Sequence, residues 1–540
     1  MKIFKYLAMG MALAIGGTFA SCVDDLDIPN PDPNAKLDLN SAEEWNGYFA
    51  SLYVNNWLNP GIFNFSDGGA GTTTRCHWNL QEITADEAVI SNKWNDPGYK
   101  VLNFNTWLTD NEWIRAAFEN EFAIAKNSAE FIQKADAARA YLSNEEVDAM
   151  IAEAHVLRGW AYMWMIDNFG RGPWVDENSI TGSIPPTYGR TELFDAITAE
   201  LVAAVNSGHL RPAAQQVYGR VSREAARALL AKLYLNSEVY TGTARWQECA
   251  AQCQEILKTI NTLAPVYKYL FCASNDKYVG NGEILWAVPQ QVGAMESWAG
   301  TTYMTAGCYV ETIDPAVLAS LGAGHLSDKG EFVGSAPWSG VRVRPELSSA
   351  FEAGDERYLF YEGTFNQGVE DLDNYDANSD GYMCIKYTYT TEDDYYNEAN
   401  LPNGSQICNA DYPLFRLSDV MLMLAECELH GVSCNGLGYL NKVRERAGLG
   451  RIPALTANAV LHERQCELYF EGWRRSDLIR FGRYTGSTYN WSWKGGVYTG
   501  AGIEDYRKLF AIPYQYVSTV GQNPGYTTVS TENDSAEGNL

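Results

Sequence analysis

"SREAARALLAKLYLNSEVY", residues 222–240, is the stretch that decides the fold class of this chain. Its alanines and leucines recur at helical spacing, and close packing of two helices needs both the small and the large side chains. The small residues are Ala225, Ala226, Ala228 and Ala231, and the large ones are Leu229, Leu230 and Leu233. Paired helices of tetratricopeptide-like repeats have this composition. The stretch therefore predicts a helix that packs against a neighbouring helix.

Similar helical patterns recur on both sides of this stretch. "SAEE" at 41–44 and "SNEE" at 143–146 are capping boxes, in which a serine oxygen caps the first turn and a glutamate reaches back to the serine amide. Apolar residues recur every three or four positions in 151–165, 191–206, 244–260, 418–430, 436–447 and 457–471. We predict a mostly α fold, with a tetratricopeptide-like scaffold of helical pairs that carries long ordered loops and a few short strands.

Two regions interrupt the helical pattern. Residues 58–110 and 265–410 are rich in Gly, Asn, Asp, Thr and aromatic residues, with short β-prone runs such as "EILWAVP" (283–289) and "YMCIKYTY" (382–389). Long ordered loops in a compact protein usually carry function. We therefore divide the chain into an N-terminal helical scaffold at 39–264 with the loop 58–110, a loop-rich ligand-binding region at 265–410, and a C-terminal helical region at 411–540 that closes the same fold.

The first 38 residues indicate export. Residues 1–21 have a basic start, an apolar run and a small-residue end, which together predict a signal peptide. Cys22 follows at the position of a bacterial lipobox cysteine, so we predict that its thiol is acylated; plain secretion is the alternative. Residues 22–38, rich in Asp and Pro, then form an acylated tether. Several acyl chains would hold the protein stably on a membrane surface.

Ten further cysteines follow, and their spacing does not identify a disulfide pairing. Cys249 and Cys253 lie four residues apart in a predicted helix, too far for a bridge, and are expected in the core. Cys384–Cys408 and Cys427–Cys434 are possible disulfide pairs that the sequence does not decide.

The composition excludes one class of partner. The net charge is −27 and the basic residues are dispersed along the sequence, which argues against a nucleic-acid backbone as partner. Aromatic residues make up 13% of the chain, with 16 Trp and 33 Tyr. Because these rings combine a flat apolar body with a polar group, this content favours a binding surface.

Blocks of sequence along the whole chain, in order and at matching spacing, resemble one known protein family. The C-terminal blocks are "YPLFRLSDVMLMLAECEL" (412–429), "LNKVRERAGL" (440–449) and "ERQCELYFEGWRRSDLIRFGRY" (463–484). Further matches are "TADEAV" (84–89), "AEAHVLRGWAYMWMIDNFGRGP" (152–173), 221–240 and "IPYQYV" with "GQNPGY" (512–526). These blocks resemble the SusD/RagB family. The resemblance implies a SusD-like helical fold, a lipid anchor in the outer membrane that faces the cell surface, and a partner that is a SusC-like TonB-dependent transporter.

Three carboxylates raise the question of catalysis. Glu463, Glu467 and Glu471 lie at i, i+4 and i+8 of one helical face, and paired carboxylates occur in glycoside hydrolases. Arg464, Arg474, Arg475 and Arg480 lie close in sequence and can neutralise them, which favours a structural network. No other catalytic motif is present, so we expect no enzyme; a lipoprotein glycoside hydrolase is the less favoured alternative.

One acidic loop is compatible with two interpretations. Asp376, Asn378, Asp380 and Tyr382 stand at alternate positions around Gly381, as in the first half of a calcium loop, but the expected glutamate is replaced by Tyr387. The second interpretation is an Asp/Asn turn whose side chains cap its own backbone. No cofactor is otherwise expected.

The candidate binding residues lie in two aromatic segments. Sugar rings stack their apolar faces on aromatic rings, while their hydroxyls need amide, carboxylate or guanidinium partners. The segments that offer this mixture contain Arg75, Trp78, Trp94, Asn95 and Asp96, and Trp298, Tyr303 and Trp338. Each aromatic residue could equally belong to the core of its loop.

These features together predict a surface lipoprotein that binds a glycan and passes it to a TonB-dependent transporter. The alternatives are a peptide-binding member of the same family and a scaffold that binds a protein through its helical groove.

Overall fold

The computed structural model describes residues 39–57, 71–91, 94, 98–180, 182–334, 336–376, 378–394 and 407–527. The predicted signal peptide, Cys22 and the tether lie outside these ranges, as do Asn95 and Asp96.

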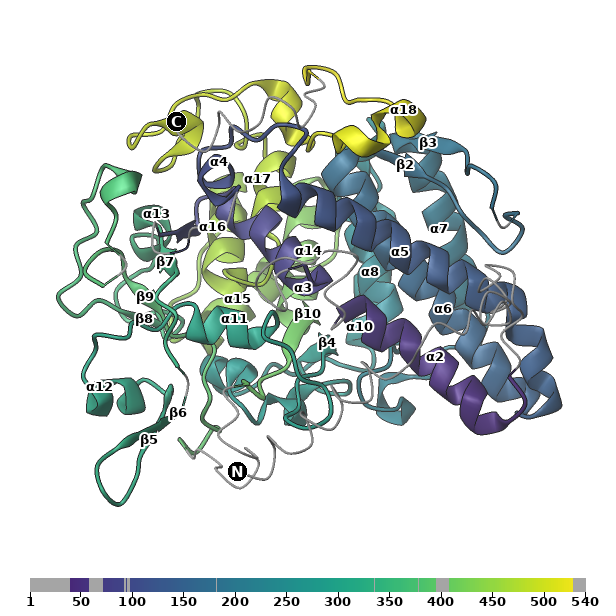
Figure 1. The fold of residues 1–540 in the computed structure, drawn as a ribbon, viewed down its shortest axis with the longest axis horizontal. Helices are drawn as coiled ribbons and strands as arrows, with labels where there is room; N and C mark the ends of the chain where they lie inside the picture. Colours follow the sequence, from purple (N-terminus) through teal and green to yellow (C-terminus); the bar gives the residue numbers. More distant parts are fainter. Residues whose placement is uncertain are drawn as a thin grey trace, which may run out of the picture.

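Most of the described chain is helical, as predicted, and Figure 1 shows the first long helices on the right. The helices that position the rest are α2 (Ala42–Trp57), α3 (Thr73–Trp78), α5 (Glu112–Lys134), α6 (Asn144–Trp164), α7 (Arg190–Asn206), α8 (Arg223–Leu235), α9 (Ser237–Thr241), α10 (Trp246–Leu257), α11 (Thr301–Ala306), α14 (Leu417–Leu429), α15 (Gly436–Arg446), α16 (Ala457–Leu468), α17 (Arg474–Arg480) and α18 (Val517–Val520).

Neighbouring helices pack in pairs. α5 packs on α6, α8 on α10, and α14 on α15, while α10 also packs on α14 and so joins the N-terminal helices to the C-terminal ones. The alanines of α8 are fully buried, which confirms the prediction from 222–240. The tetratricopeptide-like arrangement follows from these pairs.

Local contacts set the helix ends. Ser143 Oγ accepts from Glu146 N–H at 3.3 Å, and Glu146 Oε2 accepts from Ser143 N–H at 3.0 Å, which confirms the capping box of α6. The stretch 222–240 forms two helices because the chain leaves the α conformation at Asn236, whose Nδ2 donates to Lys232 O at 3.1 Å. α16 ends at Leu468, ahead of the predicted 471, and Phe470 then takes a φ of 63°.

Within the described ranges the strands form five antiparallel two-stranded sheets. They are β1 (Ala88–Ile90) with β7 (Val341–Val343), β2 (Arg171–Pro173) with β3 (Thr187–Gly189), β4 (Ile284–Val288) with β10 (Tyr412–Arg416), β5 (Gly324–Leu326) with β6 (Phe332–Gly334), and β8 (Phe360–Tyr361) with β9 (Met383–Cys384). The run 283–289 is confirmed as β4, whereas only Met383–Cys384 of 382–389 is a strand. The loops with β5 to β9 lie at the left of Figure 1.

Residues 71–91 are inserted into the C-terminal half. β1 pairs with β7, Trp78 packs edge-on against Phe470, and Asp86 Oδ1 accepts from Arg474 Nε at 2.7 Å. This segment carries the first aromatic candidates into contact with the loops at 298–340.

The ten cysteines from Cys76 to Cys466 are buried free thiols. Cys249 and Cys253 are core residues as predicted, and the two open pairs are not bonded. No helix in the described part of the chain is long and apolar enough to span a membrane.

Candidate functional site

Three tryptophans from distant segments form one continuous arc. The ring centroids of Trp94 and Trp338 lie 6.3 Å apart, and those of Trp338 and Trp298 lie 6.0 Å apart, with tilts of 48° and 41°. Trp298 is 41% exposed, whereas Trp94 and Trp338 are half-buried. The tryptophan arc (Trp94, Trp298 and Trp338) is therefore a partly exposed aromatic surface.

Backbone contacts hold the arc in place. Trp94 Nε1 donates to Trp338 O at 3.1 Å, and Trp338 N–H donates to Ala306 O at the end of α11 at 2.7 Å. A Cβ at Gly340 would lie 2.0 Å from Cε2 of Trp94, so the Trp94 ring rests directly on this glycine. Gly340 is a site residue that the sequence reasoning missed, although it stands two positions after Trp338.

Three of the predicted contact residues lie beneath the arc. Trp78 and Tyr303 are fully buried, and Arg75 is 2% exposed, so none of them can stack directly on a ligand in this structure. The Arg75 guanidinium lies 4.4 Å from the Tyr303 ring centroid and 5.5 Å from that of Trp94. We correct their assignment from contact residues to supports of the arc, because the loop packs its own core around them.

The arc has the chemistry for binding a sugar ring. The ring centroids of Tyr303 and Trp94 lie 5.5 Å apart, and the Tyr303 hydroxyl donates to Asn79 Oδ1 at 2.7 Å. This hydrogen bond fixes the ring on which Trp94 packs. Ser339, next to Trp338, is fully buried, and its Oγ accepts from Glu311 N–H at 3.1 Å, which holds the backbone beside the arc. A partly exposed aromatic face suits ligands that present apolar C–H faces, as sugar rings do.

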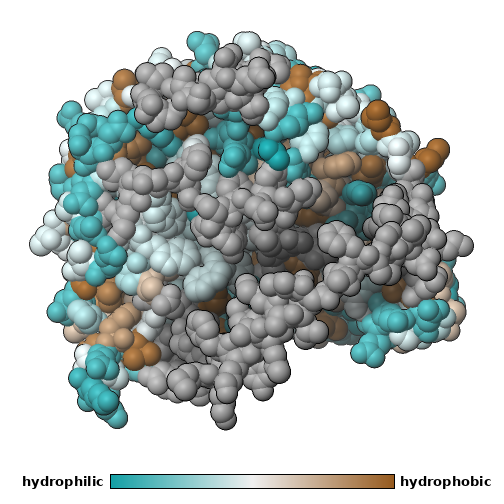
Figure 2. All heavy atoms as spheres, in the orientation of Figure 1, coloured by the Kyte–Doolittle hydropathy of each residue, from teal (hydrophilic) through white to brown (hydrophobic). Residues whose placement is uncertain are grey.

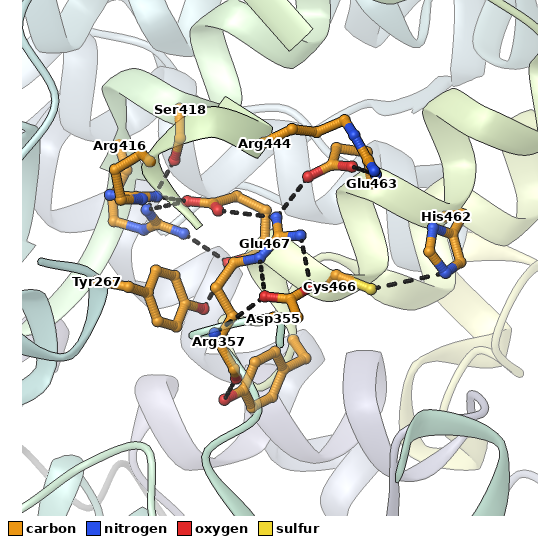
Figure 3. Close-up of polar contacts among 12 residues, drawn as sticks. Tyr267, Asp355, Arg357, Arg416, Ser418, Arg444, His462, Glu463, Cys466 and Glu467 are labelled. Carbon is orange, nitrogen blue, oxygen red and sulfur yellow. Dashed lines mark hydrogen bonds and ion pairs between the residues drawn. The ribbon is translucent and has the colours of Figure 1, made fainter. Parts of the chain in front are cut away.

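The three carboxylates of the suspected catalytic face lie in the core instead. Figure 3 shows Glu463 and Glu467 among their arginine partners. Arg357 donates to Glu463 at 2.5 Å and to Glu467 at 3.2 Å, and Arg416 donates to Glu467 at 2.8 Å and to Glu471 at 2.7 Å. The structural network is confirmed, but its cations are Arg357, Lys386, Arg416, Arg444 and Arg446.

The arginines named from sequence have other partners. Arg464 pairs with Asp419 and Asp477, Arg474 with Asp86, and Arg480 with Glu426 and Asp477, while Arg475 donates to Lys508 O. Proximity in sequence therefore gave the correct kind of network with the wrong cations.

The buried position of Glu467 decides its chemistry. Burial alone would raise the pKa of Glu467, but the guanidinium groups of Arg446, Arg416 and Arg357 together lower that pKa below its usual range. A general acid needs the opposite shift. All three carboxylates are at most 3% exposed, so a polysaccharide has no access to them.

The acidic loop at 376–382 has the contacts of a self-capped turn. Asp376 Oδ1 accepts from Asn378 N–H at 2.9 Å, and Asp380 Oδ2 accepts from Asp376 N–H at 2.7 Å. Tyr382 O, which would be a calcium ligand, accepts from Val343 N–H at 3.1 Å. The structure favours the turn interpretation, and the calcium site stays a prediction. In the described ranges, no group of three or more His, Cys, Asp or Glu side chains could hold a metal ion.

Comparison with known structures identifies the class of fold. Surface glycan-binding protein A from Bacteroides uniformis has a TM-score of 0.67 at 18% identity, covering 89% of this chain and 99% of that one. The corresponding protein from Bacteroides thetaiotaomicron in complex with laminarihexaose has a TM-score of 0.67 at 17% identity, covering 90% of this chain and 100% of that one. A SusD superfamily protein from Parabacteroides distasonis scores 0.67 at 21% identity, with coverage of 90% and 100%.

The sequence comparisons show similarity to the SusD family. Residues 287–534 match the model of the SusD family. Starch-binding protein SusD from Bacteroides thetaiotaomicron is 25% identical, and the match covers 97% of this chain and 99% of that protein. SusD-like protein P25 from Formosa agariphila is 25% identical, with coverage of 68% and 70%. Residues 287–534 thus carry the SusD family match, and the similarity to starch-binding protein SusD extends along nearly the whole chain.

Proposed function

We propose that this protein is a non-catalytic lipoprotein of the outer cell surface that binds a glycan on the tryptophan arc. The observation that carries the proposal is the arc itself, in which three rings from distant segments form one partly exposed surface. The names of similar proteins, which include starch-binding and laminarihexaose-bound examples, support a glycan as the ligand class. The enclosed carboxylates support binding without hydrolysis.

The arc is tested by binding measurements on the chain without its first 22 residues. A glycan microarray identifies ligands, and calorimetry with laminarihexaose and soluble starch follows. Trp298→Ala and Trp338→Ala should each weaken binding about tenfold or more, since a stacked aromatic contributes on the order of 1 kcal/mol beyond its buried area. Tyr141→Ala, at an exposed tyrosine outside the arc, is the matched control.

Unchanged affinity in both tryptophan variants would exclude the arc as the site. A silent array would argue against a glycan and favour the peptide-binding or scaffold alternative.

The anchor and the partner complete the proposal. Cys22 would carry the acyl chains, residues 23–38 would serve as an extended spacer, and a SusC-like TonB-dependent transporter would receive the glycan. In the producing cell, Cys22→Ala should move the protein from the outer-membrane fraction to the soluble fraction. Wild type should co-purify with an outer-membrane transporter identified by mass spectrometry. Retention of the variant in the membrane fraction would contradict the anchor.

A further inference from the structure

A groove lies along α5, and none of its lining residues belongs to the tryptophan arc. Its main cavity has a volume of 620 Å³ and lies between α5, the loop joining β2 to β3, and the segment that contains α18. Phe118 and Phe122 of α5 and Tyr516 contribute aromatic rings, and Ile184 and Pro185 of the loop line the opposite side. The volume is in the range of small-ligand sites in proteins.

The groove continues along the same helix. A second cavity of 310 Å³ shares Phe122, Lys126, Ser183 and Pro185 with the first and extends to Gln133. From Phe118 to Gln133 the helix rises by about 22 Å, at ~1.5 Å per residue. An elongated ligand therefore fits this groove better than a compact one.

The lining of the groove combines aromatic and polar side chains. Tyr516 lies 5.1 Å from Phe118 between ring centroids, and its hydroxyl donates to Glu119 Oε1 at 2.5 Å. Seven of the 15 residues that line the main cavity are polar, although most of its surface is apolar; they are Glu119, Lys126, Asn127, Ser183, Thr187, Gln515 and Thr519. Some of these groups already have partners inside the protein: Glu119 accepts from Tyr516, and the hydroxyls of Thr187 and Thr519 donate to backbone carbonyls. A chain with both hydroxyls and apolar ring faces satisfies the two kinds of surface together.

Gln515 gives an independent indication of a ligand with donors. Its Oε1 atom is buried and has no hydrogen-bond partner in the described part of the protein, and the residue lines the main cavity. Buried polar atoms are nearly always paired in native proteins. Because this oxygen has almost no exposed surface, the Gln515 side chain would have to turn toward the cavity before a ligand hydroxyl could donate to it, and that contact would remove the deficit.

The two surfaces share no residue. The tryptophan arc is built by Trp94, Trp298 and Trp338, whereas the groove is built by α5, the β2–β3 loop and residues 515–520. Figure 1 places α11, which follows Trp298, in the lower left half, and α18 with β2 and β3 at the upper right. Figure 2 shows hydrophobic and hydrophilic residues side by side at that upper right edge.

We propose that the groove along α5 is a second oligosaccharide site. The proposal rests on the proposed function for the class of ligand, but not for the position of the site. Two sites on one molecule would let it hold a polysaccharide at two points, which strengthens attachment through effective concentration.

The experiment compares four forms of the chain, each without its first 22 residues, on an oligosaccharide array and by titration with the strongest hit. They are wild type, Trp298→Ala/Trp338→Ala, Phe122→Ala/Gln515→Ala, and the combination of all four substitutions. Tyr141→Ala is the surface control. We expect the arc variant to keep some binding, and the combined variant to bind at least fivefold more weakly than the arc variant. The groove variant alone should bind fewer oligosaccharides per chain than wild type.

The outcomes separate the two proposals. Equal binding by the arc variant and the combined variant overturns the groove site and leaves the proposed function standing. A silent wild type overturns both, and loss of peptide-array binding in the groove variant would then identify a peptide groove. If Phe122→Ala lowers the thermal midpoint, Gln515→Ala alone replaces it, because no hydrogen bond is made by the Gln515 carbonyl oxygen.

Discussion

Gly340 shows how a single residue shapes the candidate site. Its missing side chain leaves the space in which the Trp94 ring lies, since an added Cβ would come within 2.0 Å of that ring. The neighbouring Gly307 would likewise bring a Cβ to 3.2 Å from Trp94 Cη2. The position of Trp94 therefore depends on two glycines, which a search for aromatic residues in the sequence does not find.

Gly340→Ala should displace Trp94 and weaken glycan binding by about as much as Trp94→Ala does. Overpacking should also cost about 1–3 kcal/mol of unfolding free energy. Calorimetric titration and chemical denaturation measure the two effects. Gly450→Ala is the control, because nothing lies within 4 Å of its Cβ position. Normal affinity in Gly340→Ala, beside weakened binding in Trp94→Ala, would refute this role.

At the scale of elements, α16 is fastened by charged pairs rather than by apolar packing alone. Its Glu463 and Glu467 pair with Arg357, which precedes β8, and Glu467 also pairs with Arg416 at the end of β10. A buried carboxylate with several guanidinium partners is costly to remove, because the partners remain buried without compensation.

Glu467→Gln should lower the free energy of unfolding at pH 7 by about 3–5 kcal/mol. The folded-state pKa of Glu467 lies below its unfolded value of about 4.3, so this stabilisation is complete above that value and is lost as the pH falls through the folded pKa. The difference between variant and wild type should therefore shrink below about pH 4.

Denaturation at several pH values measures this difference. Glu445→Gln, whose carboxylate pairs with Arg451 at 2.9 Å on the surface, should change stability by less than about 0.5 kcal/mol. A difference that stays constant between pH 3 and pH 7 would show that Glu467 does not titrate as the structure implies.

The helices could be predicted from sequence, but their ends could not. Helical periodicity is a local signal, so 222–240 and the capping box at 143–146 gave correct helices. The break at Asn236 and the end of α16 depend on single backbone conformations that periodicity does not report. The β1–β7 pair joins Ala88 to Val343, a contact without any local signal.

The candidate site divides in the same way. Composition identified the aromatic segments, yet it could not separate the exposed Trp298 from the buried Trp78, because burial depends on the whole fold. The partners of Glu463 illustrate the limit: Arg357 is 106 positions away and pairs with it, whereas the adjacent Arg464 pairs with Asp419.

At the scale of the whole molecule, contacts cross the predicted divisions of the chain. The β4–β10 pair connects 265–410 to 411–540, and α10 packs on α14. Segment 71–91 contacts the C-terminal half through Trp78 and Asp86. The tryptophan arc therefore packs on a core that all three regions share, which explains how three distant tryptophans keep one arrangement. The division into three regions stays a prediction from sequence.

The exposure of Trp298 gives the molecule an optical property. All 16 tryptophans lie in the described ranges, and Trp298, at 41%, is the most exposed of them. Water-soluble fluorescence quenchers can therefore reach the Trp298 indole more readily than the buried indoles. Emission from Trp298 would be shielded when a ring covers it, so the unlabelled protein carries its own reporter of occupancy.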